Sequence, residues 1–217
     1  MKHLLIIIII LSPFYSFSQD LFNSKNRITI LGGIDPATIL TLRYERKIDS
    51  AFFQRKLFPF IEYSTSMTQI GLTQDEIKVG QRLESWNNKS LKLITGLNTS
   101  YGKTSSLNFD SQKIAMEIDF AFGFYRKRGF FALTTSFEKI LATRLKHSDQ
   151  YRERFYSDAK DAWYKGGGGF LQMGVEGGIA IKNILEIFLE FKIPRTEKLR
   201  PMMGSPAHIN IGIAYRL

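Results

Sequence analysis

Apolar residues alternate with polar or small residues along most of the chain. The pattern is clearest in residues 113–125, KIAMEIDFAFGFY, where every second residue from Ile114 to Phe124 is apolar. The other parity holds mainly alanine and glycine with two acids, Glu117 and Asp119. Because successive side chains of a β-strand point to opposite faces, this period of two predicts a strand with one apolar face.

Segments of this kind predict eight strands. They span about residues 38–48, 57–68, 90–101, 112–125, 130–141, 168–181, 184–193 and 207–217. Residues 27–33 also have strand character, and we take them as an extension of the first strand or as a short accessory piece. Pro59 weakens the second strand, since proline cannot donate to a β-ladder. The alternative is ten strands, with another drawn from residues 68–86.

The composition of the second face indicates which way the apolar face points. It combines glycine and alanine with isolated charges such as Arg43, Glu138, Glu176 and Glu186. A water-exposed face would carry mostly long polar side chains, whereas small residues beside single charges suit the inside of a narrow barrel. We therefore expect the apolar face to point outward. The bases expected to pair with carboxylates inside are Arg43, Lys92, Lys182, Lys192 and Arg216.

Strand length and aromatic positions favour a membrane. The predicted strands run to about 10–13 residues, which matches a tilted strand that crosses hydrocarbon. Aromatic residues on the outward parity near strand ends fit the girdles that lie at membrane interfaces. These residues are Tyr44, Tyr101, Phe124 and Tyr215.

The last ten residues, HINIGIAYRL, alternate without a break from His208 to Leu217. This segment resembles the closing strand of small Gram-negative outer-membrane β-barrel proteins. The resemblance implies an all-β, antiparallel, up-and-down transmembrane barrel with an even number of strands, in which the last strand pairs with the first. It also implies insertion by the barrel-assembly machinery. We expect a monomer.

The first residues have the pattern of a secretory signal peptide. Lys2 precedes the apolar run LLIIIIIL, and small residues at Ser16 and Ser18 are spaced for cleavage after Ser18. The run is far shorter than the roughly 20 apolar residues of a membrane-spanning helix. The expected organisation is a signal peptide at 1–18 and a barrel domain at 19–217, located in the cell outer membrane.

Composition excludes several function classes. The chain has no cysteine, which excludes disulfides and thiolate metal sites. The formal net charge is +10, but basic residues are scattered among acids and apolar runs, so we expect no nucleic-acid partner. Two histidines beyond His3 give no zinc spacing, and the GGGG of 166–169 lacks the Lys-Ser/Thr of a phosphate loop. We expect no cofactor and no metal.

The predicted topology places short turns at one end and long loops at the other. With the chain's last residue in the periplasm, Lys182-Asn183 and Arg126–Gly129 are periplasmic turns, and residues 102–111, 142–167 and 194–206 are extracellular loops. Residues 69–89 do not fit, because they are too long for a periplasmic turn. The 142–167 loop carries bases and aromatics that suit a ligand-binding surface or a contact to lipopolysaccharide phosphates. A loop that packs on itself over the barrel mouth is the alternative.

Catalysis has few candidates in the sequence. His147, with Ser148 and Asp149 beside it, and His208, close to Ser205, are the histidines that could act as a general base, but adjacency does not make a triad. We therefore assign no catalytic residue. The sequence predicts an integral outer-membrane barrel with a narrow, side-chain-filled lumen and a structural or surface-binding role. The alternatives are a lipid-modifying hydrolase or acyltransferase, and a small-solute transporter that depends on lumenal Glu117 or Glu176.

Overall fold

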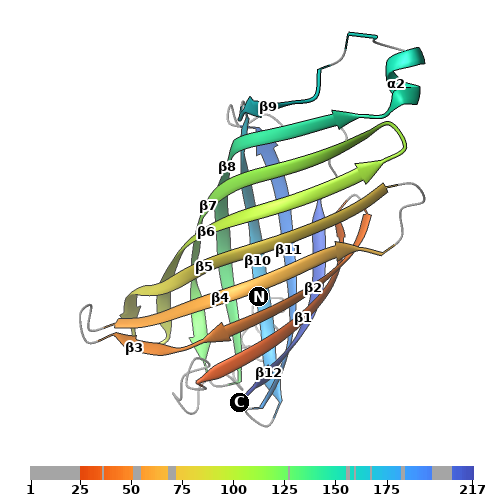
Figure 1. Ribbon diagram of the computed structural model, residues 1–217. Coiled ribbons are helices and arrows are strands. Elements are labelled where there is room, and N and C mark those ends of the chain that lie inside the picture. Colours follow the sequence, from red (N-terminus) through yellow and green to blue (C-terminus); the bar gives the residue numbers. More distant parts are fainter. Residues whose placement is uncertain are drawn as a thin grey trace, which may run out of the picture.

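The protein is a closed antiparallel β-barrel of ten strands, with two short strands outside the ring (Figure 1). The computed structural model describes residues 25–35, 37–50, 55–67, 72–126, 128–154, 157–158, 160–166, 168–181, 184–196 and 207–217. The expected signal peptide lies outside these residues. Among the described residues, no helix is long and apolar enough to cross a membrane.

Each barrel strand pairs with its neighbours in chain order. The ten strands are β1 (Asn26–Asp35), β2 (Ala37–Arg46), β4 (Arg55–Ser66), β5 (Leu72–Asn88), β6 (Leu91–Ser106), β7 (Phe109–Arg126), β8 (Gly129–His147), β10 (Gly169–Ile181), β11 (Leu185–Thr196) and β12 (His208–Arg216). The short strand β3 (Ile48–Ser50) pairs with β4, and β9 (Ala162–Lys165) pairs with β8. A short helix, α2 (Asp149–Arg154), lies beyond the end of β8 at the top of the view (Figure 1).

The barrel closes where β12 pairs with β1. Arg27 stands opposite Arg216, and the ladder continues to Ile34 opposite Ile209. Beyond the strands, the Asn26 amide donates to the Leu217 carbonyl at 3.3 Å, and the Leu217 amide donates to the Asn26 carbonyl at 2.9 Å. We call the end where these two residues meet the lower end. The resemblance-based prediction that the last strand pairs with the first is confirmed.

The main strand count of eight is wrong, and the alternative of ten is correct. One missing strand is residues 27–33, which form most of the separate barrel strand β1 and are neither an extension of the next strand nor an accessory piece. The other is β5, which accounts for the segment 69–89 that did not fit. Its outward positions mix Thr73, Asp75 and Gln81 with apolar residues. Neither set of alternate positions in this segment is therefore uniformly apolar.

Pro59 of β4 lies where the strand's pairing partner changes from β2 to β3. β2 pairs with β4 as far as Phe60, and β3 pairs with it from Leu57 onward. Pro59 falls between these two ladders, so its missing N–H interrupts neither of them. The strand therefore runs without a break despite the proline.

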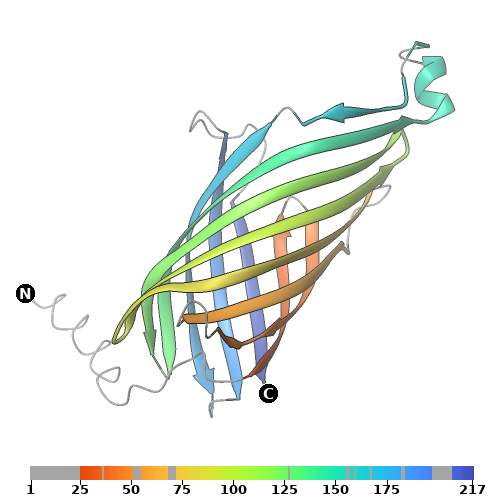
Figure 2. The ribbon, with the colours of Figure 1, turned by 60° about the vertical axis from the view of Figure 1, so that its left-hand side comes forward.

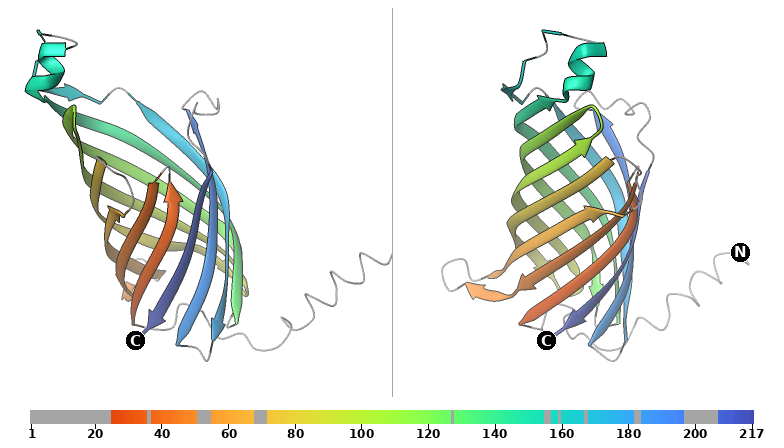
Figure 3. Two further views of the ribbon diagram at one scale, coloured as in Figure 1. Left: turned by 90° about the vertical axis from the view of Figure 1, so that its right-hand side faces the viewer. Right: turned by 45° about the vertical axis from the view of Figure 1, so that its right-hand side comes forward.

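The barrel wall is much taller on one side than on the other (Figures 2 and 3). β1 has 10 residues and β12 has 9, whereas β7 has 18 and β8 has 19. The prediction of a loop at 102–111 is wrong, because β6 continues to Ser106 and β7 already begins at Phe109. Likewise β8 continues to His147, so the long loop begins later than residue 142. At the lower end Arg126 pairs with Gly129 and Ile181 pairs with Leu185, as the predicted short connections require, while Lys127, Lys182 and Asn183 lie outside the described residues.

Candidate functional site

Most of the outside of the barrel is apolar. Large apolar side chains on the outward parity are extensively exposed, for example Ile211 at 60% and Phe124 at 57%. The aromatic residues expected at the girdles, Tyr44, Tyr101, Phe124 and Tyr215, all point outward. A continuous exposed belt of this kind is typical of a wall that faces hydrocarbon.

The inside of the barrel is filled by ion pairs. Glu186 on β11 accepts from Arg27 Nη2 of β1 at 2.7 Å and from Arg216 Nη2 of β12 at 2.5 Å. All three side chains are largely buried. The carboxylate therefore links the strands on both sides of the seam at which the barrel closes.

Further pairs fill the rest of the lumen. They are Arg43 with Glu62, Lys78 with Glu117, Arg82 with Asp119, Lys92 with Glu84, Lys113 with Glu138 and Lys192 with Glu190. Most of these pairs join different strands. Charges removed from bulk water must be paired, and this network pairs them across the wall and the lumen.

The sequence identified part of this network. The expected pairing of Arg43, Lys92, Lys192 and Arg216 with carboxylates is confirmed, whereas the side chain of Lys182 lies outside the described residues. The bases that sequence reasoning missed are Arg27, Lys78, Arg82 and Lys113. Three of them come from β1 and β5, the strands absent from the eight-strand count.

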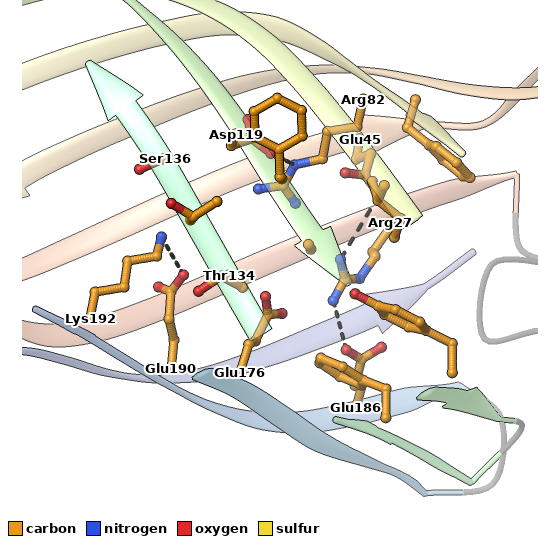
Figure 4. Close-up of a pocket in the computed structure, with 17 residues that line it drawn as sticks. Arg27, Glu45, Arg82, Asp119, Thr134, Ser136, Glu176, Glu186, Glu190 and Lys192 are labelled. Atoms are coloured by element: carbon orange, nitrogen blue, oxygen red, sulfur yellow. Dashed lines mark hydrogen bonds and ion pairs between the residues drawn. The ribbon is translucent and has the colours of Figure 1, made fainter. Parts of the chain in front are cut away.

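A small cavity lies in the lower half of the lumen (Figure 4). Its volume is about 60 Å³, which holds a few water molecules. Glu176 and Thr134 point into this cavity beside Arg27 and Arg82. Among the described residues, Glu176 makes no hydrogen bond or ion pair, unlike the other lumenal acids described above.

Aromatic rings close the lumen around this cavity. Tyr125 stacks on Phe130 with ring centroids 5.5 Å apart, and the guanidinium groups of Arg43 and Arg82 lie over the Phe60 ring at 5.2 and 5.6 Å. Phe188 is 7% exposed, and a Cβ at Gly212 would stand 2.3 Å from its ring. Glycine on the lumenal face of β12 thus makes room for the ring.

A wider polar cavity lies above, with a volume of about 320 Å³. It is lined by Arg43, Lys78, Lys113 and Lys192 with their carboxylate partners, and by His208 and Asn210. Asn210 donates to Glu190 at 2.8 Å. The lumen therefore narrows from a charged upper cavity to a plugged lower half.

The two candidate histidines lie in different parts of the structure. His208 lines the upper cavity, and Ser205 lies outside the described residues. His147 contacts Asp161 and not Asp149, with Nδ1 at 3.3 Å from Oδ1. The Ser148 hydroxyl accepts the Tyr151 amide at the start of α2, which gives it a local structural role. Within the described part of the chain, no three His, Asp or Glu side chains gather as a metal site.

The loop at the upper end is organised around Asp161. Arg152 Nη2 donates to its carboxylate at 2.6 Å, and the His147 amide donates to it at 2.9 Å. These hydrogen bonds lower the pKa of Asp161 well below its usual range, the bond from Arg152 contributing most. Trp163 and Tyr164 of the adjoining β9 remain 50% and 44% exposed.

Comparison with solved structures identifies the fold. The translocator domain of the autotransporter NalP from Neisseria meningitidis matches with a TM-score of 0.50 and 10% identity, over 100% of this chain and 95% of that domain. The chain has the fold of an outer-membrane β-barrel. Two other matches are the NanC porin, with a TM-score of 0.42 and 11% identity, and LpxR from Salmonella typhimurium, with a TM-score of 0.41 and 10% identity. Each covers 88% of this chain and 100% of its own. No protein-family model and no curated protein matches the sequence of this barrel.

Proposed function

We propose that this outer-membrane barrel is an integral protein of the cell outer membrane whose lumen is closed by its own side chains. Its role is structural or surface-binding and is carried by the upper end, and it is not an open pore. The observation that carries the proposal is the combination of an exposed apolar exterior with an interior of buried ion pairs. In hydrocarbon every backbone amide needs an internal partner, and the closed ring of ten strands provides one.

The closed lumen is supported by the size of the lower cavity. At about 60 Å³ it is too small to pass a hydrated solute, and buried side chains surround it. Lys92 is 0% exposed and Phe60 is 5% exposed, so the side chains in the lower half of the lumen are tightly packed. A conducting path would require packed rings such as Phe60 to give way.

Basic side chains on the outer wall of the upper end suit contact with lipopolysaccharide. The register places Lys103, Gln112, Arg144 and Trp163 in one outward row across β6, β7, β8 and β9. This row lies directly above the outward Tyr101 and Ile114. Bases just above an apolar belt can bind anionic phosphates while the belt contacts acyl chains. Asp75 stands opposite Lys103 in the same row.

Planar-bilayer recording tests the closed lumen. The wild-type protein, refolded and inserted, is expected to show no large steady conductance. The matched control replaces the rings of the lower lumen with the double substitution Phe60→Ala and Phe188→Ala, which should open measurable conductance and so show that insertion occurs. Large, steady conductance of the wild type would overturn the proposal.

A further inference from the structure

An apolar groove interrupts the outer wall near the lower end of the barrel. It has a volume of about 830 Å³ and is lined by residues of β7, β8, β10, β11 and β12. The outward side chains around it include Phe124, Phe131, Ile179, Ile187, Leu189 and Ile211. The groove is therefore outside the lumen and separate from the charged network.

The groove exists because one outward position has no side chain. Across the wall, Phe131 stands opposite Gly177, Gly177 opposite Leu189, and Leu189 opposite Ile211. In the row below, Ile179 stands opposite Ile187. Gly177 thus leaves a gap in an otherwise continuous row of large apolar side chains.

Neither the backbone nor the packing requires glycine at this position. A Cβ at Gly177 would lie 3.5 Å from the Phe130 carbonyl oxygen and 3.6 Å from the Phe131 ring, which are ordinary contacts. Glycine in a strand interior weakens the strand, so an apolar side chain here would be expected to stabilise it. By contrast, the neighbouring Gly178 is required, since its Cβ would meet the Phe130 ring at 2.6 Å. The missing side chain at Gly177 keeps the groove open.

Positive charge lies at the lower end of the groove. Arg126, the last residue of β7, lines the groove and also has an interaction within the protein. Arg128 follows in the turn to β8 and is exposed. An apolar slot that ends in cations matches a lipid that joins an acyl chain to a phosphate.

We propose that the groove binds one anionic glycerophospholipid, with an acyl chain against Gly177 and its phosphate at Arg126 and Arg128. The inference rests on the proposed function, because it requires the outer wall to face lipid. The bound lipid would belong to the leaflet at the lower end. It would fix the barrel's depth by tying that end to the headgroup layer.

Native mass spectrometry of the detergent-solubilised protein with added phosphatidylglycerol tests this site. The wild type is expected to retain one phosphatidylglycerol molecule. Gly177→Leu fills the groove and should weaken retention about tenfold, since roughly two buried methylenes of contact are lost. The matched control is Gly32→Leu, another exposed outward glycine, whose Cβ would meet nothing within 4 Å. It should retain the lipid like the wild type.

A second variant tests the headgroup contact without altering the groove. Arg126→Gln with Arg128→Gln should reduce retention of phosphatidylglycerol while leaving retention of an uncharged diacylglycerol unchanged. The inference is overturned if Gly177→Leu retains phosphatidylglycerol as well as Gly32→Leu does, or if a second copy of the protein displaces the lipid from the groove. Failure of the wild type to insert into phospholipid vesicles at all would instead contradict the proposed function.

Discussion

Glu176 and Glu190 stand directly opposite each other on β10 and β11, and both point into the lumen. Glu190 accepts from Lys192 at 2.5 Å and from Asn210 at 2.8 Å. Glu176 faces the small lower cavity and makes no hydrogen bond among the described residues. Two acids in one cross-strand pair thus have opposite environments, and like charges in such a pair repel.

This difference predicts opposite effects of two isosteric substitutions. Glu176→Gln should leave stability unchanged or raise it by about 0.2–1 kcal/mol, because it relieves the repulsion. Glu190→Gln should cost about 2 kcal/mol or more, because it removes the charged partner of Lys192. Urea unfolding in phospholipid vesicles measures both changes. Equal destabilisation by the two variants would contradict this account.

The seam of the barrel should depend on Glu186. Its replacement by glutamine leaves the buried guanidinium groups of Arg27 and Arg216 without their shared carboxylate, a loss of about 3–5 kcal/mol. Gel electrophoresis of samples heated to increasing temperatures measures this loss. The compact band of the folded barrel should disappear at a lower temperature for the variant than for the wild type. The control is Glu45→Gln, because Glu45 lies 3.9 Å from Arg27 and should matter less. If the control is the more damaging variant, the seam does not depend on Glu186.

The loop at the upper end should be insensitive to pH until strongly acidic conditions. Arg152 and His147 lower the pKa of Asp161 below its ordinary value of 3.8, so the contact is fully formed above that value. It is lost only as pH falls through the lower folded pKa. In a His147→Gln background, which takes the imidazole out of the readout, NMR of the residue-147 backbone amide, which donates to Asp161, should therefore show no transition between pH 7 and pH 5. Asp161→Asn should shift this resonance throughout that range, whereas the control Asp158→Asn should not.

Lipopolysaccharide contact should depend on the basic row. Replacing Lys103 and Arg144 by glutamine removes two charges worth about 1 kcal/mol each near an anionic surface, so lipopolysaccharide should dissociate about 30-fold more readily. Co-purification of lipopolysaccharide at low salt measures this change. Arg55→Gln, at the lower end, is the control and should have no effect. Unchanged co-purification in the double variant would exclude these residues as the contact.

Strands whose outward parity is uniformly apolar could be predicted from the sequence. β12 is such a strand, and so is β7 from Ile114 to Phe124. Their faces point as expected because the small-plus-charged parity cannot face lipid. β5 entered only the ten-strand alternative because Thr73 and Asp75 lie on its outward face. β1 was taken as an extension of the first strand or an accessory piece because Gly32 and Gly33 interrupt its apolar pattern.

The pairing of charges could be predicted only in outline. The sequence shows which charges share the inner parity, but partners such as Lys78 and Glu117 come from strands that are not neighbours in the wall. Their approach depends on the tilt and stagger of all ten strands, which no local pattern contains. The groove at Gly177 was missed for the same reason, since it depends on the register of β10 with β8 and β11.

Fluorescence of Trp86 tests most directly whether the apolar face looks outward into lipid. Trp86 lies on the outward face of β5, 42% exposed and 6.3 Å from the Phe122 ring, and the sequence has only one other tryptophan, Trp163. In the Trp163→Phe variant inserted into vesicles, phospholipids brominated on their acyl chains should quench the emission strongly and aqueous iodide should quench it weakly. Strong quenching by iodide with none by brominated lipid would contradict the account.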